Sequence, residues 1–165
     1  MDKHYLNGVT EIPDKIVGRV KESVINTFES ITGKRPECLE EADMGQTMHG
    51  IIGNIAVFNP DHTLSLMLAI PKETALALSN EFVGMEIPFE SDDMGDLIGE
   101  ISNILAGDVA ANIEKVGFRG QSSLPTATRG SDLTLFMPSK PPTKKLKFEG
   151  ENGEFWVNMA LSESS

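Results

Sequence analysis

The segment from Met94 to Lys115 constrains the fold of this chain more than any other part of the sequence. Its apolar residues recur at spacings of three and four, the period of a helix with one core-facing side. They are Leu97, Ile98, Ile101, Ile104, Leu105, Val109 and Ile113. Asp96, Glu100 and Asn103 fall within roughly 60° of one another on the other side. The sequence therefore predicts a long packed helix that presents a carboxylate and a carboxamide one turn apart.

Glycines lie in or beside this predicted helix, at Gly95, Gly99 and Gly107. An interior glycine costs a helix about 1 kcal/mol relative to alanine, so a purely solvated face would gain nothing from them. Because Gly99 and Gly107 lie near the polar stripe, the backbone there is bare and another molecule can approach closely. The alternative interpretation is an ordinary solvent-exposed helix face, since a Glu and an Asn at this spacing also occur by chance.

Composition and charge limit the classes of function that are open to the chain. Its 165 residues, 39% hydrophobic and 24% charged, are typical of a globular protein with a core of ordinary size. The formal charge of −11 argues against nucleic-acid binding, which needs clustered lysines and arginines. An acidic surface instead fits a protein partner with exposed lysines.

The sequence has no motif for a metal, a nucleotide or a covalent intermediate. His4, His49 and His62 are far apart, and none has another metal ligand at a recognised spacing. The nucleophile elbow, the phosphate loop and the dinucleotide fingerprint are all missing. We therefore expect no cofactor and no metal ion of the protein's own.

Cysteine content and hydropathy predict the compartment. Cys38 is the only cysteine, so no intrachain disulfide can form and a reducing compartment is favoured. The first residues lack the apolar stretch of a signal peptide, and no apolar run is long enough to span a bilayer. We expect a cytoplasmic protein.

Apolar periodicity elsewhere predicts two further helices and a set of strands. The helices are expected at residues 13–33 and 71–82, and Gly33 is a natural stop for the first. Two apolar runs, 50–58 and 63–70, flank a turn at 59–61 and predict a buried hairpin. Further extended pieces are expected at 38–42, 118–128, 132–137, 144–148 and 155–161. In the last of these, Phe155, Val157, Met159 and Leu161 share one face.

The order of these elements contains a weak internal repeat. A long helix, an extended piece and a closing hairpin occur in residues 13–70 and again in 94–161. Duplicated helix-plus-hairpin units predict an α+β fold, with a largely antiparallel sheet and both long helices packed on one face. We expect residues 1–165 to form a single domain, with the basic cluster Lys140–Lys147 as a solubilising strand edge. The first helix spaces Glu22 and Asn26 by four rather than three, so we expect a site only in the second half.

The pattern Asp96-x-x-x-Glu100-x-x-Asn103, with Pro125 further downstream, resembles the signature of the CheC, CheX and FliY chemotaxis phosphatases. The resemblance extends over most of the chain, in its size, its helix and hairpin order and its duplicated halves. A single polar motif, rather than one on each long helix, is similar to CheX in particular. The resemblance leaves the role of Pro125 open.

The resemblance implies a phosphatase acting on the aspartyl phosphate of a CheY-like response regulator. Asn103 would hold the hydrolytic water in line, and Glu100 would bond to the receiver's active-site lysine. Asp96, Gly99 and Gly107 would support this pair or contact the partner. The receiver, not this chain, would supply Mg²⁺.

The resemblance also implies a homodimer paired through sheet edges, and the apolar face of strand 155–161 favours such pairing. The helix that carries Glu100 would stay outside that contact. Two alternatives remain at this point. One is a non-catalytic adaptor that binds a receiver through the same face, and the other is a dimerisation module whose basic edge strand pairs with a second copy.

Overall fold

The computed structural model describes residues 5–40, 47–137 and 140–164. Three helices are present there: α1 (Asp14–Thr32), α2 (Lys72–Val83) and α3 (Asp92–Glu114). The strands are β1 (Glu37–Glu40), β2 (Met48–Phe58), β3 (His62–Pro71), β4 (Gln121–Ser122), β5 (Thr126–Leu133), β6 (Thr143–Gly150) and β7 (Gly153–Glu163). The predicted helices and both hairpins are therefore confirmed, with ends shifted by a few residues.

Local sequence sets where the helices begin and end. Gly33 and Gly84, at φ 76° and 81°, close α1 and α2 in the left-handed conformation that glycine adopts without strain. The third helix begins at Asp92, two residues before the predicted start at Met94, because Ser91 caps it. The Ser91 hydroxyl accepts a hydrogen bond from the Met94 amide at 3.2 Å. The carboxylates of the first turn favour this end further.

The sheet is antiparallel throughout, in the order β1-β6-β7-β3-β2-β4, with β5 also paired to β2. The hairpins β2–β3 and β6–β7 meet at the centre through the β3–β7 pair. Each short strand after a long helix lies beside the hairpin of the other half: β1 on β6, and β4 and β5 on β2. The predicted α+β class with a largely antiparallel sheet is confirmed.

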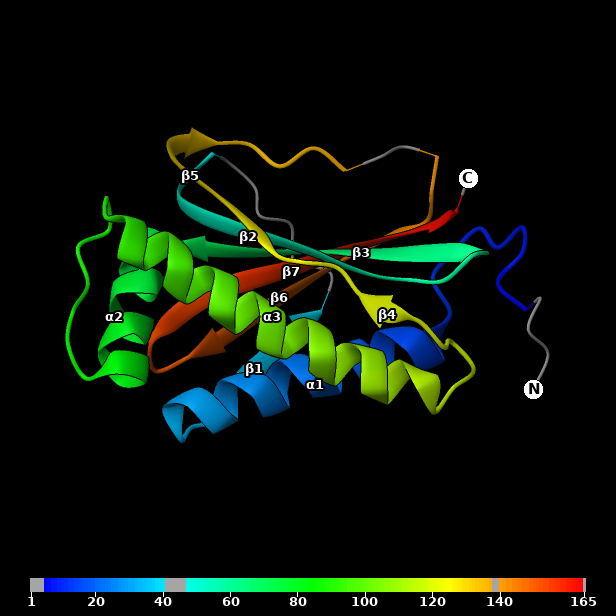
Figure 1. Cartoon of the computed structure of the whole chain (residues 1–165), viewed down its shortest axis with the longest axis horizontal. Coiled ribbons are helices and arrows are strands. Elements are labelled where there is room, and N and C mark those ends of the chain that lie inside the picture. Colours follow the sequence, from blue (N-terminus) through cyan, green and yellow to red (C-terminus); the bar gives the residue numbers. More distant parts are fainter. Residues whose placement is uncertain (1–4, 41–46, 138–139, 165) are drawn as a thin grey trace.

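All three helices lie on one side of the sheet (Figure 1). The main core fills the space between these layers, and Phe155, Val157, Met159 and Leu161 belong to it as predicted. A second apolar cluster of Met48, Ile52, Ala69 and Trp156 lies on the other face. Among the residues that the structure describes, no helix combines the length and the hydrophobicity that crossing a membrane requires.

The predicted strand at 132–137 is confirmed only for its first two residues. The strand β5 runs from Thr126 to Leu133, and residues 134–137 belong to no strand. The alternation of Leu133 and Leu135 has another cause, because both pack against the second apolar cluster. Of the predicted piece at 38–42, residues 38–40 lie in β1 and the rest lies outside the described residues.

The prediction that the basic cluster Lys140–Lys147 forms a strand edge is wrong for its last residue, Lys147. Lys147 of β6 is paired with Leu39 of β1 on one side and with Trp156 of β7 on the other. Its amine lies 3.1 Å from the Glu154 carboxylate and 3.4 Å from that of Glu149, so its charge is paired with two carboxylates of the same sheet. Nor is β7 an edge, since it lies between β6 and β3.

Candidate functional site

The helix α3 approaches the sheet closely at Gly53 of β2. A Cβ atom placed on Gly53 would lie 2.1 Å from the hydroxyl oxygen of Ser102, and Ser102 is fully buried. The same Cβ atom would lie 3.5 Å from the Ile98 side chain. Only glycine allows this contact, so Gly53 sets how deeply α3 sits and where its outer face lies.

A second element is fastened to the start of this helix by Arg129 of β5. Its guanidinium donates hydrogen bonds to the carbonyls of Phe89 at 3.0 Å and of Ser91, the helix-capping residue, at 2.6 Å. It also lies 3.6 Å from the carboxylate of Glu90. Because the side chain is partly buried, these bonds hold β5 in a set position relative to the first turn of α3.

Between α3 and the link from β4 to β5 lies an open groove of about 520 Å³. It is lined by Gly95, Asp96, Gly99, Glu100, Asn103, Leu124, Pro125 and Ala127. This volume is enough for several side chains of a protein partner, and the groove is too open to enclose a small molecule. The fold thus brings Pro125 to the motif on α3, although the two are distant in sequence.

Four of the five predicted site residues line this groove, and Asp96, Glu100 and Asn103 are exposed. Gly107 is exposed one turn further along the helix, but it is not among the residues that line the groove. A Cβ atom on Gly99 would meet nothing within 4 Å in the part of the chain that the structure describes, so the bare backbone expected from the sequence is present.

The helix α3 has six carboxylates and no lysine, arginine or histidine. They are Asp92, Asp93, Asp96, Glu100, Asp108 and Glu114. Within the described residues, no ion pair or hydrogen bond occupies the side chain of Asp96, Glu100 or Asn103. The Glu100 carboxylate can therefore bind a cationic group of another molecule. The Asn103 carboxamide can both donate a hydrogen bond to water and accept one from it. In the part of the chain that the structure describes, no three His, Cys, Asp or Glu side chains cluster closely enough to hold a metal ion.

Sequence analysis missed Leu124 and Ala127, which complete the groove from the β4–β5 link. The Leu124 side chain is 88% exposed. A single apolar residue in a polar link has no periodicity to mark it, and its place directly before Pro125 was the only local signal.

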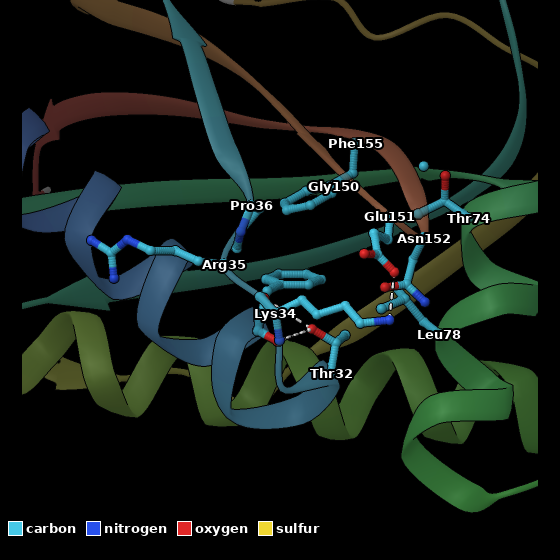
Figure 2. Close-up of a pocket in the computed structure, with 12 residues that line it drawn as sticks. Thr32, Lys34, Arg35, Pro36, Thr74, Leu78, Gly150, Glu151, Asn152 and Phe155 are labelled. Atoms are coloured by element: carbon cyan, nitrogen blue, oxygen red, sulfur yellow. Dashed lines mark hydrogen bonds and ion pairs between the residues drawn. The ribbon is translucent and has the colours of Figure 1, made fainter.

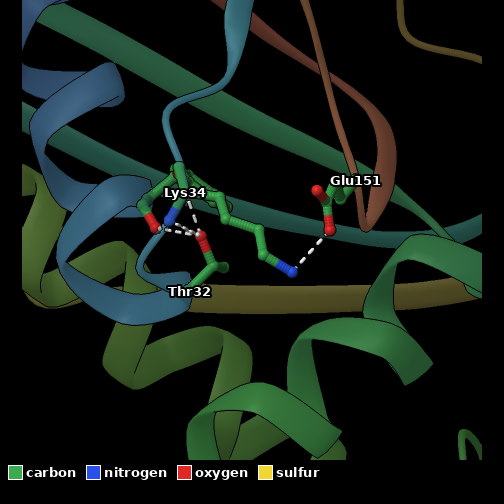
Figure 3. Close-up of polar contacts among 4 residues, drawn as sticks. Thr32, Lys34 and Glu151 are labelled. Atoms are coloured by element: carbon green, nitrogen blue, oxygen red, sulfur yellow. Dashed lines mark hydrogen bonds and ion pairs between the residues drawn. The ribbon is translucent and has the colours of Figure 1, made fainter.

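A narrower pocket lies where α1 ends and the β6–β7 turn begins (Figure 2). Its volume is about 20 Å³, enough for roughly one water molecule. Figure 3 shows Lys34 reaching across to the carboxylate of Glu151 at its rim, and this hydrogen bond raises the pKa of Lys34. Two stacked rings, Phe28 and Phe155, border the pocket. We interpret it as a small packing gap rather than a ligand site.

An antiparallel sheet with three helices packed on one face is the fold of the CheC-like proteins. The family model for the chemotaxis phosphatase CheX matches residues 51–149, and the chain belongs to this family. No curated protein sequence matches the chain.

Solved structures with the same fold cover nearly the whole chain. A CheC-like superfamily protein from Shewanella sp. PV-4 has a TM-score of 0.80 at 16% identity, covering 92% of this chain and 99% of the other. The chemotaxis protein CheX from Vibrio vulnificus has a TM-score of 0.79 at 15% identity, covering 90% and 99%. The CheX–CheY–BeF3–Mg²⁺ complex from Borrelia burgdorferi contains a chain with a TM-score of 0.72 at 14% identity, covering 90% and 98%. At these identities the likeness shows a shared fold.

Proposed function

We propose that this protein dephosphorylates the aspartyl phosphate of a CheY-like receiver domain by positioning a hydrolytic water. The observation that carries the proposal is the exposed Glu100–Asn103 pair, unoccupied within the described residues, on a helix whose other face is buried. Membership of the CheX family supports the activity. The complex of a CheX with CheY among the similar structures supports the choice of partner.

The chemistry needs little more than position. In phosphoryl transfer, most of the catalysis comes from alignment and from charge stabilisation, and a receiver's own Mg²⁺ and lysine supply the charge. What a receiver lacks is a well-aligned water molecule. The carboxamide of Asn103 would donate a hydrogen bond to that water and accept one from it. The oxygen atom of the water then attacks phosphorus. The bond from phosphorus to the aspartate oxygen then breaks, which releases inorganic phosphate and restores the receiver's carboxylate.

The carboxylate of Glu100 would fix the docking register. It lies one turn before Asn103 on the same exposed stripe and would accept a charge-assisted hydrogen bond from the receiver's active-site lysine. Asp96, one turn earlier, adds negative charge on the same side of the groove and favours the approach of a cation.

The proposal is tested by phosphate loss from a panel of phosphorylated receivers from the same cell, with and without the protein. Acceleration of phosphate loss from at least one receiver is expected. A non-catalytic adaptor would bind a receiver without any acceleration. Absence of acceleration for every receiver would contradict the phosphatase proposal.

Replacing Glu100 by glutamine is expected to raise the protein concentration for half-maximal dephosphorylation by about tenfold, because the hydrogen bond loses its charge assistance. The saturating rate should change little. The difference from wild type should shrink as salt is added, since screening weakens exposed charge pairs. Glu73→Gln, an exposed glutamate of α2 outside the groove, carries the same charge change and should behave as wild type. Full activity of Glu100→Gln at low protein concentration would show that the charge has no role.

We also propose a homodimer paired through a sheet edge. The edges within the described residues are β1 on one side and β4 with β5 on the other. Because Ala127 of β5 lines the groove, pairing through β1 leaves α3 open to a receiver. Light scattering at micromolar concentration is expected to give twice the chain mass, with one receiver bound per chain. A monomer mass, or a dimer that buries Asn103, would contradict this arrangement.

A further inference from the structure

We infer that Leu124 is an apolar anchor that docks against the receiver domain beside its phosphorylated aspartate, an inference that rests on the proposed function. Leu124 lies in the link between β4 and β5 and lines the same groove as Glu100 and Asn103. With 88% of its surface exposed, it is the most exposed large apolar residue among those described. Single exposed apolar residues are common on protein surfaces, so exposure alone does not mark a binding residue. The restrained backbone of Leu124 and the residues around it distinguish this one.

The position of Leu124 is restrained from both sides. The preceding residue, Ser123, is bonded twice to Ala56 of β2: its amide donates to the Ala56 carbonyl at 2.8 Å, and its hydroxyl accepts from the Ala56 amide at 2.9 Å. The following residue is Pro125, whose ring confines the backbone of Leu124 to extended conformations. A leucine whose backbone is held in this way loses little backbone freedom on binding, so only the ordering of its side chain has to be offset.

A second apolar side chain lies on the other side of the polar stripe. Around α3, Asn103 lies about 60° to one side of Glu100 and Ile104 about 40° to the other. Ile104 was expected on the core-facing side, but it is 39% exposed and is not among the buried residues of α3. The Glu–Asn pair therefore lies between two apolar residues, which would exclude water from the contact and strengthen the charged hydrogen bond.

The charge of this face identifies the occupant. The helix beside Leu124 carries six carboxylates and no cation, so two copies of this face would repel each other. A receiver fits better because its active-site lysine lies next to the phosphorylated aspartate. The partner must present a cationic side chain for Glu100 and, beside it, apolar side chains for Leu124. Both contacts would form in the same groove.

The test measures binding to a receiver activated with beryllofluoride and Mg²⁺, and in parallel the dephosphorylation rate. Leu124→Ala is expected to weaken binding by about tenfold, the loss that follows from leaving most of a leucine's apolar surface out of a contact. Its saturating rate and its melting temperature should equal those of wild type, since Leu124 packs against little in the free protein. Leu124→Met should restore most of the affinity. The loss should persist at high salt, unlike that of Glu100→Gln.

Phe136→Ala is the matched control, since Phe136 is 85% exposed and lies outside the groove. It is expected to bind the receiver as wild type does. Equal affinity of wild type and Leu124→Ala would overturn the inference and leave the phosphatase proposal intact. Weakened binding by Leu124→Ala, with no acceleration of phosphate loss by wild type, would support the anchor and overturn the phosphatase. Dissociation of a homodimer by Leu124→Ala would overturn the inference, because the anchor would then belong to a contact between copies.

Discussion

Asn103→Ala is expected to lower the saturating rate of receiver dephosphorylation by about 100-fold or more, while receiver binding and the fold are retained. The loss follows from the proposed role, because alanine has no donor or acceptor to align the water. The Asn103 side chain is exposed and has no hydrogen-bond partner among the described residues, so its removal breaks no contact within the protein. The measurement is single-turnover phosphate release at saturating protein, beside binding to the beryllofluoride-activated receiver.

Asn26→Ala is a matched control for this experiment. Asn26 is an exposed asparagine on the other long helix, α1, and lies outside the groove. The control is expected to retain the full saturating rate. If Asn103→Ala retained it as well, the water-positioning role would be wrong, whatever the affinity for the receiver.

Gly53→Ala is expected to reduce the free energy of unfolding by about 1–3 kcal/mol, the range for overpacking a closely packed interior. The new methyl group would lie 2.1 Å from the Ser102 hydroxyl, a distance at which one of the two elements has to move. A displaced α3 would carry Glu100 and Asn103 away from Pro125, so the dephosphorylation rate should fall as well. Urea unfolding and the saturating rate are the two measurements.

Ser102→Ala provides the check on this explanation. The Ser102 hydroxyl is buried and has no hydrogen-bond partner among the described residues, so its removal alone should cost little stability. Combined with Gly53→Ala, it should recover part of the lost unfolding free energy and of the rate, because the closest contact is gone. Gly18→Ala on α1, where a Cβ atom meets nothing within 4 Å, should instead stabilise the protein by up to about 1 kcal/mol. A neutral effect of Gly53→Ala would show that α3 is not positioned by this contact.

The helices and the central hairpin were predictable because their signals are local. Apolar spacing and Gly33 place α1 almost to the residue. The turn between β2 and β3 is set by Asn59, whose side-chain oxygen accepts hydrogen bonds from the amides of Asp61 and His62 at 2.9 and 2.8 Å. The exposure of Glu100 and Asn103 follows in the same way from helical periodicity.

The strand order was not predictable in this way. The alternating apolar residues in 132–137 indicate which side chains are buried, and the lysines of β6 indicate charge. Neither pattern indicates which strand pairs with the segment that carries it. Strands pair through backbone groups, which every residue has. A short strand such as β1 can therefore pair with part of β6, although the lysines of β6 favoured an unpaired edge.

The sequence by itself determined the helix of the site, its buried face and its exposed Glu100–Asn103 pair, because a helix is built from contacts within a few residues along the chain. Only the tertiary structure decided what faces that pair. Gly53 sets the depth of α3, Arg129 ties β5 to its first turn, and the β4–β5 link brings Leu124 and Pro125 to the groove. These contacts join residues that are distant in sequence, and such pairings depend on how the whole chain packs rather than on any local pattern.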